Sequence, residues 1–97
     1  MLDKIKQLME LKKQADRIKR ELDAISVECQ EVKGIKIEMT GSQRIKMIDI
    51  DEIYLKPENK NKLQADLERS FNTALQKSQN MAAQKMKDVL PGGFPGL

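Results

Sequence analysis

Residues 35–50 read IKIEMTGSQRIKMIDI, and their polarity alternates with a period of two. Ile35, Ile37 and Met39 are apolar while the residues between them are polar, which is typical of a strand with one buried face. The Gly-Ser pair at 41–42 favours a turn, after which the alternation resumes. The stretch therefore predicts a β-hairpin, and this hairpin decides the fold.

The loop length of the hairpin sets which residues face each other. A three-residue loop at 41–43 pairs Met39 with Ile45. It also pairs Ile37 with Met47, whereas a two-residue loop would set these apolar residues opposite charged ones. We therefore predict the three-residue loop and an inward face made of Ile37, Met39, Ile45 and Met47.

The end of the hairpin breaks the alternation. Ile48 and Ile50 have the opposite parity to Ile45 and Met47, which predicts a β-bulge at 47–48 and a second sheet face that is partly apolar. One short chain offers little to cover both faces. A symmetric homodimer that buries the second face or joins sheet edges is the simplest remedy.

The segments on either side of the hairpin complete the fold. Residues 3–25 contain apolar side chains every three or four positions, without Gly or Pro, and predict a helix. Residues 26–31 alternate again and predict a first strand. Pro57 suits the first turn of a last helix, which meets no breaker until Pro91. We therefore predict an α+β fold, with an N-terminal helix, a three-stranded antiparallel sheet and a long C-terminal helix.

The last helix is too long for its own chain to cover. About 33 residues at about 1.5 Å each give roughly 50 Å, whereas a compact domain of about 100 residues has a radius of gyration of only about 13 Å. The helix must therefore project or pair with another chain, which again favours a homodimer.

Length and composition limit the number of domains, the possible disulfide and metal sites, and the cellular location. The chain has 97 residues, 3% aromatic residues, one Cys and no His. We predict one domain over 1–90, followed by a flexible Pro/Gly tail at 91–97. A lone Cys excludes an internal disulfide, and the lack of His disfavours a metal site. No apolar stretch is long enough to span a bilayer, and a free thiol without an export signal predicts the cytoplasm.

The sequence predicts no enzyme, and neither a cofactor nor a small-molecule substrate. General acid–base chemistry usually uses His, and Cys29 has the inward parity of a core residue rather than an exposed nucleophile. Asp49, Asp51 and Glu52 cluster after the hairpin, but their spacing does not match a calcium loop. We expect an exposed acidic strand end there.

The placement of the basic residues is more informative than the net charge of +3. At about 100° per residue, one ridge of the first helix spans about 60° opposite the apolar stripe and contains Lys6, Lys13, Arg17 and Arg20, although Glu10 interrupts it. Either this ridge is a solvated face with ion pairs one turn apart, or it binds a polyanion. Lys85 lies on the apolar stripe of the last helix, where it either extends to solvent or faces an anion. With few aromatic residues to stack on bases, a duplex gripped through its phosphates fits best.

Four segments together resemble one family. They are MLDKIKQLMELKKQADRIKREL, IKMIDID, LQADLERSFNTALQKSQ, and MAAQKMKDV with the ending PGGFPGL. Their order and spacing resemble the YbaB/EbfC family of bacterial nucleoid-associated DNA-binding proteins over essentially the whole chain. The resemblance implies a homodimer whose paired sheets form a central body. Its first and last helices would project as tweezer-like arms that bind DNA in the nucleoid.

The resemblance and the charges together predict the DNA-binding residues. Both chain ends would lie away from the sheet, which would gather lysines of the two helices near one arm tip. The predicted set is Lys4, Lys6, Lys12, Lys13, Arg17, Arg20, Lys77, Lys85 and Lys87. We expect binding to double-stranded DNA with weak sequence preference, for nucleoid organisation or gene regulation. The alternative is a prefoldin-like protein-binding or chaperone module that uses its helical arms.

Overall fold

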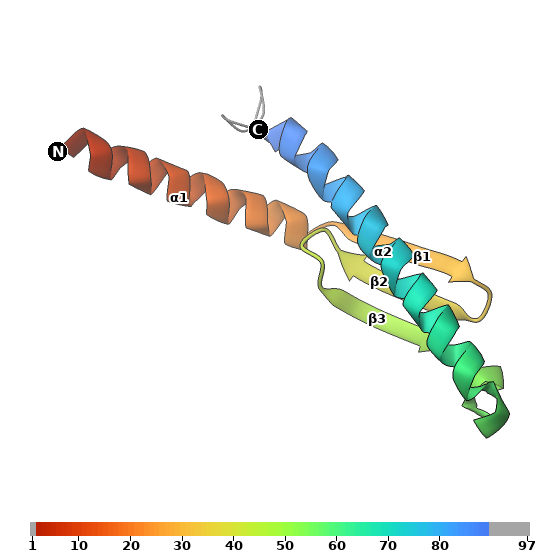
Figure 1. Ribbon diagram of the computed structural model, residues 1–97. Coiled ribbons are helices and arrows are strands. Elements are labelled where there is room, and N and C mark those ends of the chain that lie inside the picture. The colour runs from red at the N-terminus through yellow and green to blue at the C-terminus, as the bar shows by residue number, and fades with distance from the viewer. Residues whose placement is uncertain (1, 90–97) are drawn as a thin grey trace.

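The computed structural model describes residues 2–89, which form an elongated body of 66 × 20 × 19 Å. Figure 1 shows one helix that leaves the end of a three-stranded sheet and a second helix that crosses the sheet. The elements in chain order are α1 (Leu2–Asp23), β1 (Ser26–Val32), β2 (Ile35–Thr40), β3 (Ile45–Ile50), two short 3-10 turns (Glu52–Leu55 and Pro57–Asn59) and α2 (Lys60–Val89). The predicted α+β fold is confirmed. The predicted tail at 91–97 lies outside the described residues.

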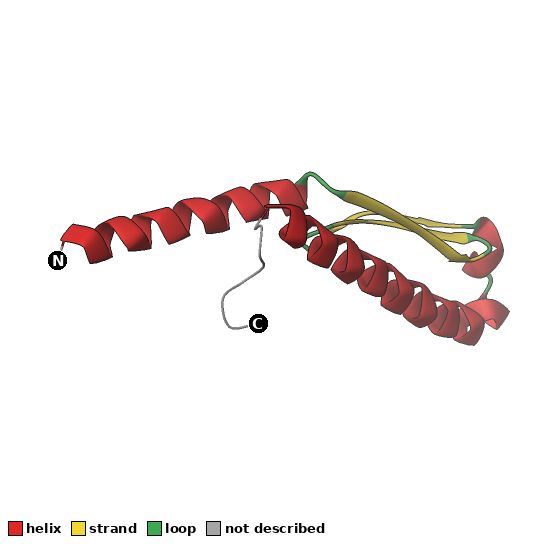
Figure 2. Cartoon of the chain, turned by 90° about the horizontal axis from the view of Figure 1, so that it is seen from above, coloured by secondary structure: helices red, strands yellow, loops and turns green. Residues whose placement is uncertain are grey.

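Pro57 opens a 3-10 turn and not the last helix itself. The turn spans Pro57–Asn59, and the Asn59 N–H donates to the Lys56 carbonyl (2.9 Å). Helix α2 follows directly and has 30 residues, which gives a length of about 45 Å. Figure 2 shows that α2 lies along one face of the sheet, so the body has two layers. The helix that stands alone is therefore α1, whereas the sequence pointed to the last helix.

The sheet is antiparallel in the order β1-β2-β3, so β2 is the central strand. The turn between β1 and β2 contains Gly34, whose φ of 97° lies in the left-handed region that favours glycine. A Cβ at this position would also lie 3.1 Å from the Tyr54 ring. Glycine is therefore required there for both conformation and space.

The register of β2 and β3 differs in part from the prediction. The Met39–Ile45 pair is the one expected for a three-residue loop. Beyond it, Ile37 pairs with Ile48, so the predicted partner of Ile37 is wrong. The extra residue in β3 is Lys46, which places the bulge earlier than predicted.

The bulge reverses the predicted faces at the end of β3. Ile48 and Ile50 turn to the same face as the inward residues of β2, whereas Met47 lies opposite Glu38 on the outer face. The predicted inward position of Met47 is therefore wrong. The bulge also moves both isoleucines away from the second face, so Met47 is the apolar residue of β3 that lies there.

The outer face of the sheet is covered by charge pairs. Lys36 Nζ lies 3.3 Å from Glu28, and Lys46 Nζ lies 3.5 Å from Glu38. The Ser26 hydroxyl donates to Glu38 Oε1 (2.6 Å), and this hydrogen bond, followed by the nearby Lys46 charge, lowers the pKa of the Glu38 carboxyl. A face of this kind is stable in water and needs no second chain to bury it.

The core lies between α2 and the inner faces of β1 and β2. Cys29 and Ile37 are fully buried there, as predicted, and Ile35 is buried with them. Helix α2 brings its axis close to the sheet because small residues recur at every fourth position on its buried side: Ser70, Ala74 and Ser78. The Ser78 hydroxyl also donates to the Thr40 carbonyl (2.7 Å), which ties α2 to the end of β2.

Helix α2 packs mainly against β1 and β2 and leaves the edge strand β3 uncovered. Ile45 and Ile48 are on the inner face, yet 48% and 43% of their surfaces are exposed. The predicted burial of Ile45 is therefore wrong for the single chain, because the helix does not reach it. Ile53 and Leu55 in the following turn are exposed as well.

Candidate nucleic-acid interface

Helix α1 is held to the body at its C-terminal end, and every side chain of residues 2–17 is exposed. At that end the Gly41 N–H donates to the Leu22 carbonyl (3.0 Å), and the Ser42 hydroxyl donates to the Asp23 carboxylate. A Cβ on Gly41 would lie 2.9 Å from the Leu22 oxygen, so only glycine lets the turn approach this closely. We call this contact between the β2–β3 turn and the end of α1 the joint.

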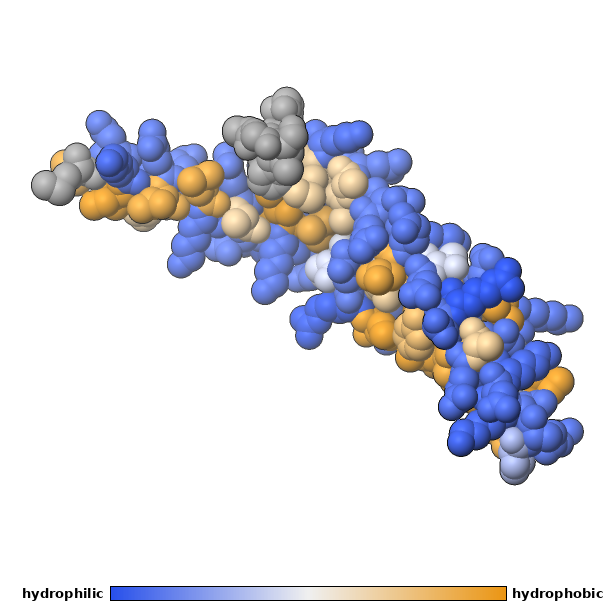
Figure 3. All heavy atoms as spheres, viewed as in Figure 1, coloured by the Kyte–Doolittle hydropathy of each residue, from blue (hydrophilic) through white to orange (hydrophobic). Residues whose placement is uncertain are grey.

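The apolar stripe of α1 is open to solvent. Figure 3 shows it as orange spheres along one side of the helix. Ile5, Leu8 and Leu11 expose 54%, 67% and 61% of their surfaces. An amphipathic helix with an unburied apolar stripe is expected to bury it against another molecule.

The predicted basic ridge lies on the other side of α1. Its four exposed side chains are Lys6, Lys13, Arg17 and Arg20. Among residues 2–89, no carboxylate lies within ion-pairing distance of any of these four. The helical repeat places Lys4 on the apolar side and Lys12 between the two sides. The ridge therefore presents unneutralised positive charge, and Lys4 and Lys12 point in other directions.

The lysines of the two helices do not gather at one tip within a single chain. Lys85 Nζ lies 3.3 Å from the Glu21 carboxylate, near the joint, whereas Lys4 lies about 25 Å further along α1 at about 1.5 Å per residue. The expected cluster is therefore wrong for Lys85, which is partly exposed and pairs with Glu21 instead. Lys77 and Lys87 are exposed on α2.

Glu21 is a site residue that the sequence pattern does not reveal. Its only signal was a position four residues after Arg17, which points to a pair within α1 and not to Lys85. The contact needs α1 and α2 to meet, which no local pattern shows. Glu21 also lines a shallow hollow of about 370 Å³ together with Arg17, Arg20 and Ala24.

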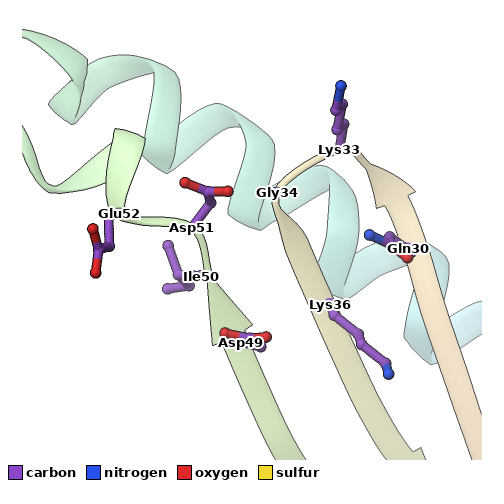
Figure 4. A pocket seen from close by; sticks show the side chains of 8 residues that line it. All are labelled: Gln30, Lys33, Gly34, Lys36, Asp49, Ile50, Asp51 and Glu52. Carbon is purple, nitrogen blue, oxygen red and sulfur yellow. The ribbon is translucent and has the colours of Figure 1, made fainter.

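A larger hollow of about 690 Å³ lies at the other end of the sheet, away from α1. Figure 4 shows the carboxylates of Asp49, Asp51 and Glu52 near the end of β3, with Lys36 on β2 and Lys33 in the turn between β1 and β2. All three carboxylate residues are exposed, as predicted for an acidic strand end. No group of three or more His, Cys, Asp and Glu within residues 2–89 is arranged to hold a metal ion. The carboxylates make this end of the molecule a poor surface for a polyanion.

The fold and the charges define a class of protein, namely an elongated α+β chain with an exposed helical arm that is apolar on one side and basic on the other. In the part of the chain that the structure describes, no helix is long and apolar enough to cross a membrane. The chain belongs to the YbaB/EbfC DNA-binding family, whose model matches residues 1–94, so the resemblance seen in the sequence is confirmed. A search of curated proteins found no match. Membership of a DNA-binding family supports DNA as the partner and suggests a non-enzymatic role.

Proposed function

We propose that this protein binds double-stranded DNA as a homodimer in the nucleoid, mainly through backbone phosphates and with weak sequence preference. Its role is to organise the nucleoid or to regulate gene expression. The observation that carries the proposal is the ridge of Lys6, Lys13, Arg17 and Arg20, which is exposed and unpaired within the described chain. Membership of a DNA-binding family favours DNA over a protein client as the partner.

The homodimer follows from two uncovered apolar surfaces. One is the stripe of α1, and the other is the inner face of β3, where Ile45 and Ile48 are exposed beside α2. A second copy of the chain carries the same two surfaces, so a two-fold arrangement can bury them in pairs. We propose that the two α1 helices then form the arms of a tweezer-like dimer.

Phosphate contacts fit the side chains that α1 offers. Stacking on bases needs accessible aromatic rings, but of the two aromatic residues within 2–89, Tyr54 is buried and Phe71 is partly buried against the core. Lysine and arginine contacts to phosphates position a protein on DNA and do not read the bases. The residues that we propose for these contacts are Lys6, Lys12, Lys13, Arg17, Arg20, Lys77 and Lys87. Lys4 lies on the apolar side of α1 that the dimer would bury, and Lys85 is paired with Glu21.

The test is a salt series of duplex binding by the wild type and by the double variant K6Q/K13Q. Each phosphate contact lowers the logarithm of affinity by about 0.9 per tenfold rise in salt. We therefore expect the double variant to flatten the slope by about one to two units per chain. Binding to unrelated sequences should weaken alike.

The matched control is K56Q/K60Q, which removes the same charge from two exposed lysines near the start of α2, far from α1. This control should keep the wild-type slope. A K6Q/K13Q slope equal to the wild type would place the DNA site off α1. A wild-type protein that binds no duplex even at low salt would overturn the proposed function and favour the prefoldin-like alternative.

A further inference from the structure

Near the joint, the Glu21 carboxylate of α1 forms an ion pair with the Lys85 ammonium group of α2. Lys85 falls on the same side of α2 as the buried residues Ala74 and Ser78, but beyond the sheet, where that side meets α1. Its ammonium lies 3.3 Å from the Glu21 carboxylate, and 37% of each side chain is exposed. The pair is thus accessible to solvent and to another anion.

The surroundings of Glu21 are basic. Arg17 and Arg20 line the same hollow as Glu21, and neither is paired with a carboxylate of residues 2–89. Glu21 is therefore paired with Lys85 of α2 and shares a hollow with two arginines of its own helix that it does not pair with. A phosphate that enters the hollow meets Arg17 and Arg20 directly, whereas Lys85 can join them only by leaving Glu21.

We propose that Glu21 is an internal counter-anion that withholds Lys85 from DNA and so limits the affinity of the protein for the duplex. The inference rests on the proposed function, since it concerns the strength of that binding. A DNA phosphate and the Glu21 carboxylate compete for one ammonium group. Because the carboxylate is tethered beside Lys85, it prevails, and the wild-type protein makes one phosphate contact fewer per chain than its exposed charges allow.

Removal of the carboxylate should release the lysine. We expect E21Q to bind duplex more tightly by about fivefold to tenfold per chain near 0.1 M salt, with a slope steeper by about one unit per chain, because one more counterion is released. We expect K85Q alone to keep the wild-type slope. The double variant E21Q/K85Q should lose the gain of E21Q, which is the signature of coupling between the two residues.

Two further variants separate the pairing from net charge. E10Q removes an exposed carboxylate from the same helix, one that has no ion pair within the described chain. E21D keeps the charge but retracts the carboxylate by one methylene, so it should show part of the E21Q gain without any change in net charge. Circular dichroism and sedimentation should show that all variants keep the wild-type fold and assembly.

The outcomes distinguish this inference from the proposed function. If the wild type binds duplex and E21Q gains no more than E10Q, the counter-anion role is wrong while DNA binding stands. A gain that persists in E21Q/K85Q would also overturn it, because Lys85 would not be the released cation. If neither the wild type nor any variant binds duplex at low salt, the proposed function and this inference fall together.

Discussion

Tyr54 shows how one side chain holds several parts of the body in place. It is buried under the turn between β1 and β2, and its hydroxyl donates to the Asp66 carboxylate on α2 (2.9 Å). The Lys33 carbonyl lies 3.4 Å from the same oxygen. Gly34 makes room for the ring because it has no Cβ. The tyrosine thus links the 3-10 turn, the sheet and α2 at the end of the molecule opposite α1.

The hydrogen bond to Asp66 predicts how Tyr54 titrates. The bond favours the protonated phenol, and burial and the charges of Asp66 and Asp51 act in the same direction, so the pKa of Tyr54 is raised above its ordinary value of 10. Its stabilising effect is therefore complete below pH 10 and is lost as the pH rises through the folded-state pKa. Because the chain has one Tyr and no Trp, phenolate absorbance reports on this residue alone.

The measurement is an absorbance titration at alkaline pH of the wild type and of D66N. We expect the transition of the wild type to lie above that of the unfolded chain in denaturant, and that of D66N to move back toward it. Asparagine can still accept the hydrogen bond but carries no charge. A wild-type transition that coincides with that of the unfolded chain would show that Tyr54 does not hold this bond in solution.

At the scale of the elements, the hairpin shows what a sequence pattern determines and what it leaves open. The strict alternation before the turn predicted β2, and the Met39–Ile45 pair followed from the loop length. The position of the bulge did not follow, because an extra residue at Lys46 or at 47–48 leaves that pair unchanged. The structure places Ile48 and Ile50 inward and one methionine outward, so the arrangement with more apolar surface on the core side is the one adopted.

Burial on β3 could not be read from the strand itself. Parity tells which face a residue lies on, but α2 determines which part of that face is covered, and the small residues that seat α2 lie about 20 to 33 positions further along the chain. The candidate site also combines a feature that one element predicts by itself with one that depends on a distant element. The ridge on α1 was predictable because a helix fixes the angle between its own residues. The Glu21–Lys85 pair was not, because it depends on where two helices meet.

Substitutions at two neighbouring residues of β2 should differ strongly in their effect on stability. Ile37 is fully buried, so I37K places an ammonium group in the core, at a penalty of several kcal/mol that abolishes stable folding. Lys36 lies on the outer face, and K36I removes a surface ion pair with Glu28 worth about 0–1 kcal/mol. Urea unfolding followed by circular dichroism should show the first chain unfolded in water and the second close to wild type. Similar damage from both would mean that both faces of β2 are buried.

At the scale of the whole molecule, the described chain is far from compact. Its radius of gyration is 18.6 Å, whereas a compact domain of about 100 residues has about 13 Å. The excess comes largely from α1, whose 22 residues make few contacts with the rest of the chain. In proteins, most helical stability comes from the packing of an amphipathic face, and the described chain covers little of the apolar stripe of α1. We therefore expect packing against a second chain, as in the proposed dimer, to stabilise α1.

Sedimentation should reveal the dimer and the surface that forms it. At low micromolar concentration we expect a mass of about twice the 11.1 kDa chain. I48K, on the uncovered inner face of β3, should weaken the dimer, whereas M47K, on the polar outer face, should leave it intact. A folded monomer at this concentration would contradict the dimer. Loss of assembly in M47K but not in I48K would place the contact on the outer face.

The joint has a mechanical consequence for the arm. Helix α1 is about 33 Å long at about 1.5 Å per residue, so a tilt of about 10° at its base moves its tip by roughly 6 Å. Phosphates along one DNA strand are spaced about 3.4 Å apart in projection on the duplex axis, so this small rotation moves the tip by almost two phosphates, whereas Arg20, close to the base, hardly moves. The close contact of Gly41 with Leu22 lies at the base of the arm, so a small change of angle there gives a large displacement at the tip. The angular precision of one glycine turn thus sets the positional accuracy of charges at the far end of the molecule.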